Sequence, residues 1–281
     1  MYNLPLPEIP LADWVDSFVD KITDTFGTFF EGFANVIEVF WDLLVKGLLL
    51  PPPIIVIALF ALVAFLVSRK IGFTIFTFVG LLFILSLGYW THTMQTVSLV
   101  LCSVLLSLII GIPVGIWASQ NNKVSSVITP ILDFMQTMPA FVYLIPSIIF
   151  FGIGVVPGIV ASVIFAMPPT IRLTNLGIRQ VPEDLVEASN AFGSTTSQKL
   201  FKVQLPLATP TIMAGINQSI MLSLSMVVIA SLVGAPGLGT EVFRAVTRIE
   251  VGTGFASGIC IVILAIILDR ITQNLKPSQK I

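Results

Sequence analysis

Long apolar runs with almost no charged residues set the strongest limit on what this sequence can fold into. Each run is close to the ~20 residues that an α-helix needs to cross a bilayer. One charge at the centre of such a helix costs roughly 2.5 to 3.5 kcal/mol on insertion scales. We therefore expect an all-α polytopic membrane protein with about seven transmembrane helices. The expected helices cover about residues 50–67, 71–90, 93–118, 131–151, 153–171, 207–233 and 251–268.

Composition excludes several other classes of protein. With 56% apolar and 10% charged residues and a mean hydropathy of +1.00, the chain has too little polar surface for a soluble globule. The net charge of −1 gives no basic field, so no nucleic-acid partner is expected. Cys102 and Cys260 lie in apolar runs without a nearby His or acid, which favours small core residues over a disulfide or metal ligands. Residues 1–14 lack a basic region followed by an apolar core, so no cleaved signal peptide is expected.

The first 50 residues differ from the rest of the chain. They hold eight of the fifteen acidic residues, yet their apolar residues recur every three or four positions from Trp14 to Leu44. This spacing predicts a long amphipathic helix with acids on its other face. We expect such a helix to lie in the membrane interface or to pack along the bundle without crossing the membrane, and a solvent-facing helix that packs only on protein is the alternative.

The distribution of Lys and Arg predicts the orientation. If the polar segment 187–206 is cytoplasmic, seven crossings place the N-terminus outside and the C-terminus inside. Only four basic residues, Lys21, Lys46, Arg244 and Arg248, then lie outside. The cytoplasmic side carries ten, which agrees with the positive-inside rule. These ten are Arg69, Lys70, Lys123, Arg172, Arg179, Lys199, Lys202, Arg270, Lys276 and Lys280.

The segment 180–206 is polar and helix-prone in a mostly apolar chain. Pro182 suits a first helical position, and Leu185, Ala188 and Phe192 form one apolar face of a short helix. Gly193 can adopt the left-handed turn that ends this helix.

A second short helix follows in the same segment. Thr195 and Gln198 have the spacing of a capping box, in which each side chain accepts from the other residue's backbone N–H. Pro206 is expected to stop or kink this second helix.

The same segment resembles the EAA loop of bacterial ABC importer permeases. Glu187, Ala188 and Gly193 match, as do Leu205 and Pro206, whereas Ser189 and Val203, which follows Gly193 after nine further residues, depart conservatively. The family has Ala where Ser189 stands and Ile where Val203 stands. The resemblance implies a cytoplasmic coupling helix that docks in a cleft of a separate ATPase subunit, with Glu187, Ala188 and Gly193 as the foremost coupling residues.

A wider stretch, 135–185, resembles the permeases of glycine betaine and proline betaine importers, and the likeness continues to the glycines at 234–239 and covers about 90–270. It implies a type I ABC importer permease domain over 51–281, with its core at 90–272 and its coupling loop at 180–206. It also implies two copies of this chain in a bacterial inner membrane, a separate extracytoplasmic binding protein, and alternating access for a quaternary-ammonium solute. The sequence has no GxxxxGK[ST] motif, so ATP and Mg are expected on the partner ATPase and this chain is expected to be no enzyme and to bind no cofactor.

Pro and Gly residues interrupt the fourth and fifth expected helices. Such interruptions are tolerated at membrane depth where the backbone is covered by protein or lines a cavity, so this region is the candidate pathway wall. A fixed cation is best held by desolvated cation–π contacts, although most Phe residues in a bundle pack or face lipid. The candidate aromatics are Phe134, Phe141, Tyr143, Phe150, Phe151 and Phe165.

Four polar residues are further candidates. Arg244 and Arg248 are spaced i and i+4 on a short outer helix and could meet either acids of a docked binding protein or lipid headgroups. We interpret Asp133, after Thr129 and Pro130, as a first-turn acid that complements a helix dipole, and a substrate counter-ion is the alternative. His92 is interpreted as an interface anchor because the sequence shows no partner for proton transfer.

Two pairs of glycines, Gly111 with Gly115 and Gly254 with Gly258, are expected to permit close helix approach.

Other functions remain open. The same type of permease could carry choline, carnitine, methionine or a sulfonate. An ion-coupled carrier or channel is a different class, but the expected helices 71–90, 93–118 and 207–233 contain no acid or base for a coupling ion. An intramembrane enzyme is disfavoured because HExxH, a nucleophile motif and paired intramembrane acids are missing.

Overall fold

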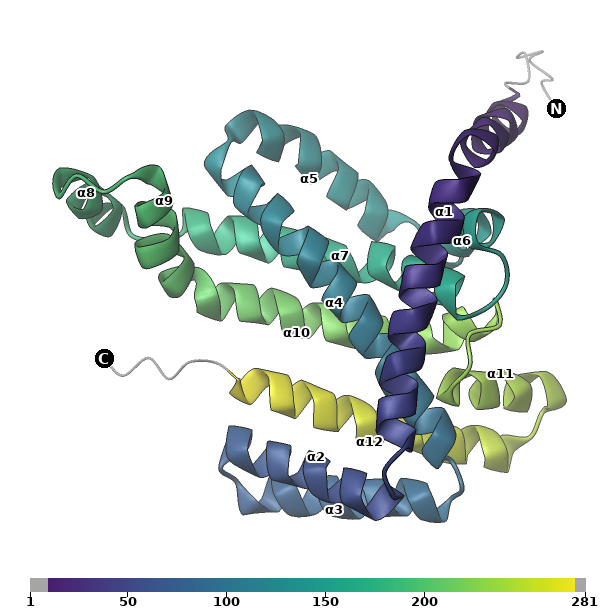
Figure 1. Ribbon diagram of the computed structural model, residues 1–281. Helices are drawn as coiled ribbons and strands as arrows, with labels where there is room; N and C mark the ends of the chain where they lie inside the picture. The colour runs from purple at the N-terminus through teal and green to yellow at the C-terminus, as the bar shows by residue number, and fades with distance from the viewer. Residues whose placement is uncertain (1–9, 276–281) are drawn as a thin grey trace, which may run out of the picture.

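The computed structural model describes residues 10–275, and this part of the chain is helical without any strand (Figure 1). Expectations for Glu8 and for Lys276 and Lys280 fall outside the described residues. The helices are α1 (Leu11–Leu49), α2 (Pro53–Ser68), α3 (Ile71–Ser86), α4 (Trp90–Gln120), α5 (Asn122–Thr137), the 3-10 turn η1 (Ala140–Tyr143), α6 (Leu144–Phe151), α7 (Val155–Arg179), α8 (Glu183–Ala191), α9 (Thr196–Lys199), the π-helical turn η2 (Leu200–Gln204), α10 (Leu205–Ser231), α11 (Leu238–Arg248) and α12 (Val251–Asn274).

The predicted all-α membrane architecture is confirmed. Within residues 10–275, four helical stretches are long and apolar enough to cross a bilayer: α4, α7, Thr196–Ser231 and α12. Two bent pairs raise the number to as many as six: α1 with α2, at 101°, and α5 with η1 and α6, at 107°. α3 is a shorter apolar helix of 16 residues. This count is lower than the seven that we expected.

The expected interruption of the helix at 131–151 is confirmed, and the two halves meet at 107°. α5 ends at Thr137, and Met138 adopts an extended backbone with φ −69° and ψ 135°. The ring of Pro139 clashes with a helical conformation of the residue before it, which explains the break. The second half of this crossing therefore runs at a steep angle to the first.

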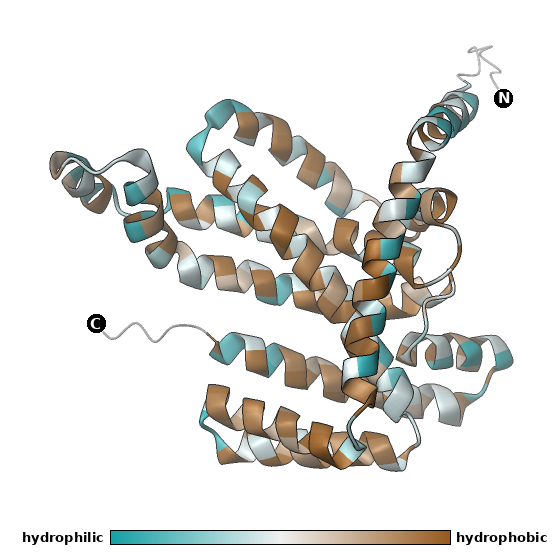
Figure 2. Ribbon diagram, in the orientation of Figure 1, coloured by the Kyte–Doolittle hydropathy of each residue, from teal (hydrophilic) through white to brown (hydrophobic). Residues whose placement is uncertain are grey.

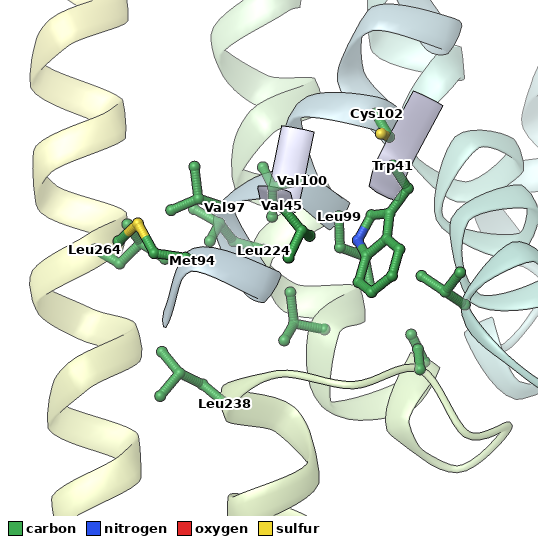
Figure 3. Packing of buried hydrophobic residues seen from close by; sticks show 14 of the residues in the cluster. Trp41, Val45, Met94, Val97, Leu99, Val100, Cys102, Leu224, Leu238 and Leu264 are labelled. Atoms are coloured by element: carbon green, nitrogen blue, oxygen red, sulfur yellow. The ribbon is translucent and has the colours of Figure 1, made fainter. Parts of the chain in front are cut away.

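The core of the molecule is where α4, α7 and α10 pack together. Figure 3 shows how α1, α11 and α12 add side chains to it: Trp41 and Val45 from α1, Leu238 from α11 and Leu264 from α12 meet Met94 and Val97 of α4 and Leu224 of α10. Cys102 is a buried free thiol in this cluster, and Cys260 is also buried and free. Both cysteines are therefore core residues, as expected.

Glycines set the spacing between α4 and α7. A Cβ at Gly111 would lie 3.0 Å from Thr170, and one at Gly115 would lie 2.6 Å from Thr174. The predicted close approach is confirmed there, and Gly254 is similarly tight, with 3.3 Å to Ala245. For Gly258 the expectation is wrong, since a Cβ would meet nothing within 4 Å.

The long N-terminal helix α1 is confirmed. Phe30 stacks on Phe150 of α6 with ring centroids 4.7 Å apart, so this part of α1 packs along the bundle. Closer to the N-terminus, Trp14 and Phe18 are 60% and 64% exposed. The helix thus combines a segment packed on protein with a segment that presents an uncovered apolar face.

Candidate functional site

The segment α8–α9–η2 projects beyond the ends of α7 and α10, at the opposite end of the bundle from α11 (Figure 1). Figure 2 shows hydrophilic residues around α9 and at the α4–α5 turn, whereas the bundle helices are mostly hydrophobic. Pro182 is the residue before the first turn of α8 and not its first helical residue, which corrects our expectation by one position. Glu183 and Asp184 occupy the first turn, where acids complement the helix dipole.

The turn between α8 and α9 has the predicted geometry. Gly193 has φ +75°, a left-handed conformation that side chains other than Asn or Asp rarely adopt. The capping box is complete: Gln198 N donates to Thr195 Oγ1 at 3.3 Å, and Thr195 N donates to Gln198 Oε1 at 3.0 Å. Lys199 Nζ donates to Asn190 Oδ1 at 3.4 Å and ties α9 to α8.

Pro206 does not stop the helix, so of the two outcomes that we expected, a stop or a kink, the stop is wrong. The chain is helical from Thr196 to Ser231, and Pro206 stands in the first turn of α10. The π turn η2 explains this, because Leu205 N donates to Leu200 O, five residues back. The wider turn re-pairs the backbone just before the proline, which has no N–H to donate.

The predicted apolar face of α8 is uncovered in this chain. Leu185 is 44% exposed and Phe192 is 91% exposed, and Ala188 is exposed between them. Glu187 is exposed as well. An exposed apolar stripe beside a carboxylate is suited to docking on another protein.

Two of the remaining motif residues, Ser189 and Leu205, anchor the α8–α9 segment through buried contacts. Ser189 is buried, and its Oγ donates to Val186 O at 2.8 Å. Leu205 packs against the buried residues Ile178, Ala208 and Ile212. Pro206 is exposed. The motif therefore divides into outward-facing residues on α8 and anchoring residues at Ser189 and Leu205.

The candidate pathway aromatics do not form one cluster within the described chain. Tyr143 is buried, donates its hydroxyl to Met135 O at 2.5 Å and shares a small cluster with Phe165. Phe134 and Phe141 are more than half exposed. Phe150 and Phe151 pack against Phe30 of α1, with centroids at 4.7 and 5.6 Å. Whether any of them lines a path stays a prediction.

At the opposite end, Glu241 is a buried acid on α11. Arg244 Nη1 lies 2.9 Å from Glu241 Oε1, and His92 Nε2 of α4 lies 3.7 Å from the same oxygen. His92 therefore has an acidic partner, which we did not expect because the two residues are far apart in sequence. Burial, and after it the Glu241 carboxylate, raises the pKa of the neighbouring Tyr89 phenol above its ordinary value.

Both candidate docking arginines have acids close to them. Besides the Arg244–Glu241 pair, Arg248 Nη1 lies 4.0 Å from Glu250 Oε1. The side chains of Arg244 and Arg248 are nevertheless 48% and 64% exposed, so both still present guanidinium groups at the surface.

Asp133 has a different environment from the one that we expected. α5 begins at Asn122, with the Asn121 side chain accepting from two backbone N–H groups, so Asp133 is not in its first turn. Its Oδ1 accepts from Arg172 Nη2 of α7 at 2.7 Å. The sequence places Arg172, Asn175 and Arg179 on one face of α7, because they are spaced three and four residues apart, but it does not show that this face meets α5.

Comparisons with known proteins agree with this architecture. The family described as "binding-protein-dependent transport system inner membrane component" matches residues 111–281. The glycine betaine transport system permease protein OpuAB of Bacillus subtilis (strain 168) is 62% identical over 275 residues, 98% of this chain and 97% of that protein. The glycine betaine/carnitine transport permease protein GbuB of Listeria monocytogenes serotype 1/2a (strain 10403S) is 57% identical over 282 residues, 98% of each chain.

One solved structure shows the fold. An inward-facing crystal form of the MetNI methionine ABC transporter superposes with a TM-score of 0.61 at 24% identity, covering 67% of this chain and 96% of that one. The helical bundle of this chain is consistent with that likeness. The chain belongs to the family of binding-protein-dependent transport system inner membrane components and has the fold of a type I ABC importer permease.

Proposed function

We propose that this chain is the transmembrane permease subunit of an ATP-driven ABC importer that moves glycine betaine, or a related quaternary-ammonium osmoprotectant, across the bacterial cell membrane. The observation that carries this proposal is 62% identity to a glycine betaine permease over 98% of the chain. The exposed α8 segment with Leu185, Glu187 and Phe192 supports a partner that docks there.

The proposed partners are an ABC ATPase subunit, an extracytoplasmic substrate-binding protein, a second copy of this permease and membrane lipid. The ATPase binds ATP and Mg and meets the α8–α9 segment through Glu187, Ala188 and Gly193. Two copies are required because an ATPase dimer offers two clefts. The binding protein docks at the other end, where Arg244 and Arg248 are exposed, and contact of these arginines with lipid headgroups is the alternative.

The proposed mechanism is alternating access. ATP binding closes the ATPase dimer and draws the two α8–α9 segments together. Because Thr196–Ser231 is one helical stretch, this movement passes from α9 directly into the membrane helix α10. The bundle then opens toward the loaded binding protein, and ATP hydrolysis restores the inward-facing state.

A second candidate is a permease for another quaternary ammonium compound. The name of the Listeria monocytogenes relative includes carnitine, and the choline transport system permease protein OpuBB of Bacillus subtilis (strain 168) is 32% identical over 65% of this chain. Competition of labelled glycine betaine uptake by unlabelled carnitine and choline separates these substrates. The solute with the lowest inhibition constant is the one that the importer binds most tightly.

The test is uptake of radiolabelled glycine betaine into vesicles with ATP inside, with each component omitted in turn. We expect uptake only when permease, ATPase and binding protein are all present. Uptake by this chain alone, unchanged by ATP, would identify a gradient-driven carrier and refute the proposal.

A further inference from the structure

The C-terminal end of α7 carries an arginine whose three guanidinium nitrogens are all used. Arg179 Nε donates to Asn175 Oδ1, Nη1 donates to Asn122 Oδ1 and Nη2 donates to Ala118 O, each at 2.8 Å. Asn175 lies on α7, Asn122 begins α5, and Ala118 is in the last turn of α4. One side chain therefore joins the ends of three helices.

Arg179 also stands next to the coupling segment. It is the last residue of α7, and only residues 180–182 separate it from Glu183, where α8 begins. α8 itself packs on α9 and η2. A displacement of α8 can thus enter the bundle by two covalent routes: through η2 into α10, and through residues 180–182 into the end of α7.

Helix α5 depends on this end of α7 for its position. Leu132 is the one residue of α5 that is buried in the described chain, so apolar burial holds α5 only weakly. Polar contacts to α7 do so instead: besides Arg179, Asn175 Nδ2 donates to Ser125 Oγ at 3.2 Å and Arg172 pairs with Asp133 at 2.7 Å. Arg172, Asn175 and Arg179 form what we call the polar seam.

Through α5, the polar seam is connected to the bent helix pair formed by α5, η1 and α6. α5 continues through the break at Met138 into η1 and α6, which carry Phe141, Tyr143 and Phe150. The Tyr143 hydroxyl donates back to Met135 O of α5 at 2.5 Å, so the two halves of the bent pair are linked beyond the break. Movement of α5 therefore changes the position of η1.

We propose that Arg179 is a positioning residue that transmits movement of the α8–α9 segment to α4 and α5 and so to the bent helix pair. The proposal rests on the proposed function, since it assumes an ATPase docked on α8. A guanidinium is required because its planar fork of donors can reach three acceptors in fixed directions, whereas a lysine ammonium is a single point charge on a flexible stem.

The experiment compares Arg179→Ala and Arg179→Lys in the complete reconstituted importer, with Arg270→Ala as the matched control. Arg270 is an exposed arginine on α12, and within residues 10–275 its side chain has no hydrogen bond or ion pair. We measure glycine betaine imported per ATP hydrolysed. We expect this ratio to fall at least about tenfold for both Arg179 variants, with ATPase turnover retained, and to stay unchanged for the control.

A merely structural role would give a different result. If Arg179→Lys keeps the wild-type ratio, or if uptake and ATPase activity fall together, the positioning role is refuted. As a second variant, Asn122→Ala removes one acceptor and is expected to lower the ratio in the same direction. In the Asn122→Ala background, Arg179→Lys is expected to add less than it does alone, since the two residues share one contact.

Hydrogen–deuterium exchange on the permease alone tests the contacts of Arg179 without requiring any transported substrate. We expect faster exchange of 118–126 in both Arg179 variants and wild-type exchange in Arg270→Ala. Unchanged exchange of 118–126 in the Arg179 variants would refute the proposed role of Arg179, whatever the result of the transport measurement. A wild-type complex that imports no glycine betaine would instead refute the proposed function, and the two failures are thereby distinguished.

Discussion

The two ends of the bundle use glycine for different physical reasons. At the α8 end, Gly193 has φ +75°, but a Cβ there would meet nothing within 4 Å. At the α11 end, a Cβ at Gly239 would lie 2.2 Å from Val227 O, and one at Gly237 would lie 2.6 Å from Thr96 Oγ1. Gly193 is needed for its backbone conformation alone, Gly239 is needed for space, and Gly237, at φ +139°, is needed for both.

This difference distinguishes an exposed surface at the α8 end from a closely packed contact at the α11 end. α11 is fixed to the bundle by the fully buried Leu238 and by Leu238 N, which donates to Thr96 Oγ1 at 2.9 Å. α8 shows an exposed apolar face instead, with Phe192 91% exposed. Substitutions at the α11 end are therefore expected to disturb folding, and those at the α8 end are expected to disturb coupling in a folded protein.

The largest effect is expected for Gly239→Ala. The clash is with backbone atoms of α10, which no rotamer change can relieve, and overpacking of this kind costs about 3 kcal/mol. The apparent melting temperature of the purified chain should fall by about 6 °C or more. Gly258→Ala is the matched control, since a Cβ there meets nothing within 4 Å, and it should melt like the wild type. Equal melting of both variants would show that α11 is not held by close packing.

The next effect is expected for Gly193→Val. A β-branched residue at φ +75° costs about 1–2 kcal/mol locally, but the site is open and the bundle should keep its melting temperature to within a few degrees. ATP hydrolysis should no longer drive uptake, because the direction of α8 relative to α9 is changed. Gly193→Asn is the control, since Asn tolerates this conformation. Normal coupled uptake by Gly193→Val would remove Gly193 from the coupling machinery.

The same contrast explains how much could be predicted from sequence. The α8–α9 turn could be predicted because its causes are local: Gly193 supplies the left-handed residue, and Thr195 and Gln198 are three positions apart. The long helix α1 and the membrane helices follow from periodicity and charge-free runs for the same reason. Family membership came from a motif whose residues are close together in the chain.

Contacts between distant segments could not be predicted. Asp133 with Arg172 and His92 with Glu241 become neighbours only after folding, so the sequence alone suggested a helix-dipole acid and an anchor without a partner. The expectation of a possible stop at Pro206 was wrong because the π turn before it has no recognised residue pattern. The break at Met138 did have a signal, Pro139, but a short apolar run does not show at what angle its two halves meet.

A smaller and local effect is expected for Thr195→Ala. It removes the acceptor of the capping box at the start of α9, and such a loss costs about 1 kcal/mol. The change should raise hydrogen exchange at 196–199 without altering exchange in α10 or the melting temperature of the bundle. Thr195→Ser keeps the hydroxyl and should exchange like the wild type. Faster exchange throughout α10 would mean that the two ends are less independent than their contacts indicate.

The smallest effect is expected for Asp133→Asn. The carboxylate and the guanidinium of Arg172 are 58% and 43% exposed, and an ion pair of this kind contributes less than about 1 kcal/mol. Loss of the charge should therefore change the KM for glycine betaine by less than about fivefold, because a tenfold change corresponds to about 1.4 kcal/mol. Arg172→Gln, which removes the other partner, should give a similar change. A KM raised by several orders of magnitude in Asp133→Asn alone would identify Asp133 as the counter-ion of the transported cation, and would place a substrate contact between α5 and α7.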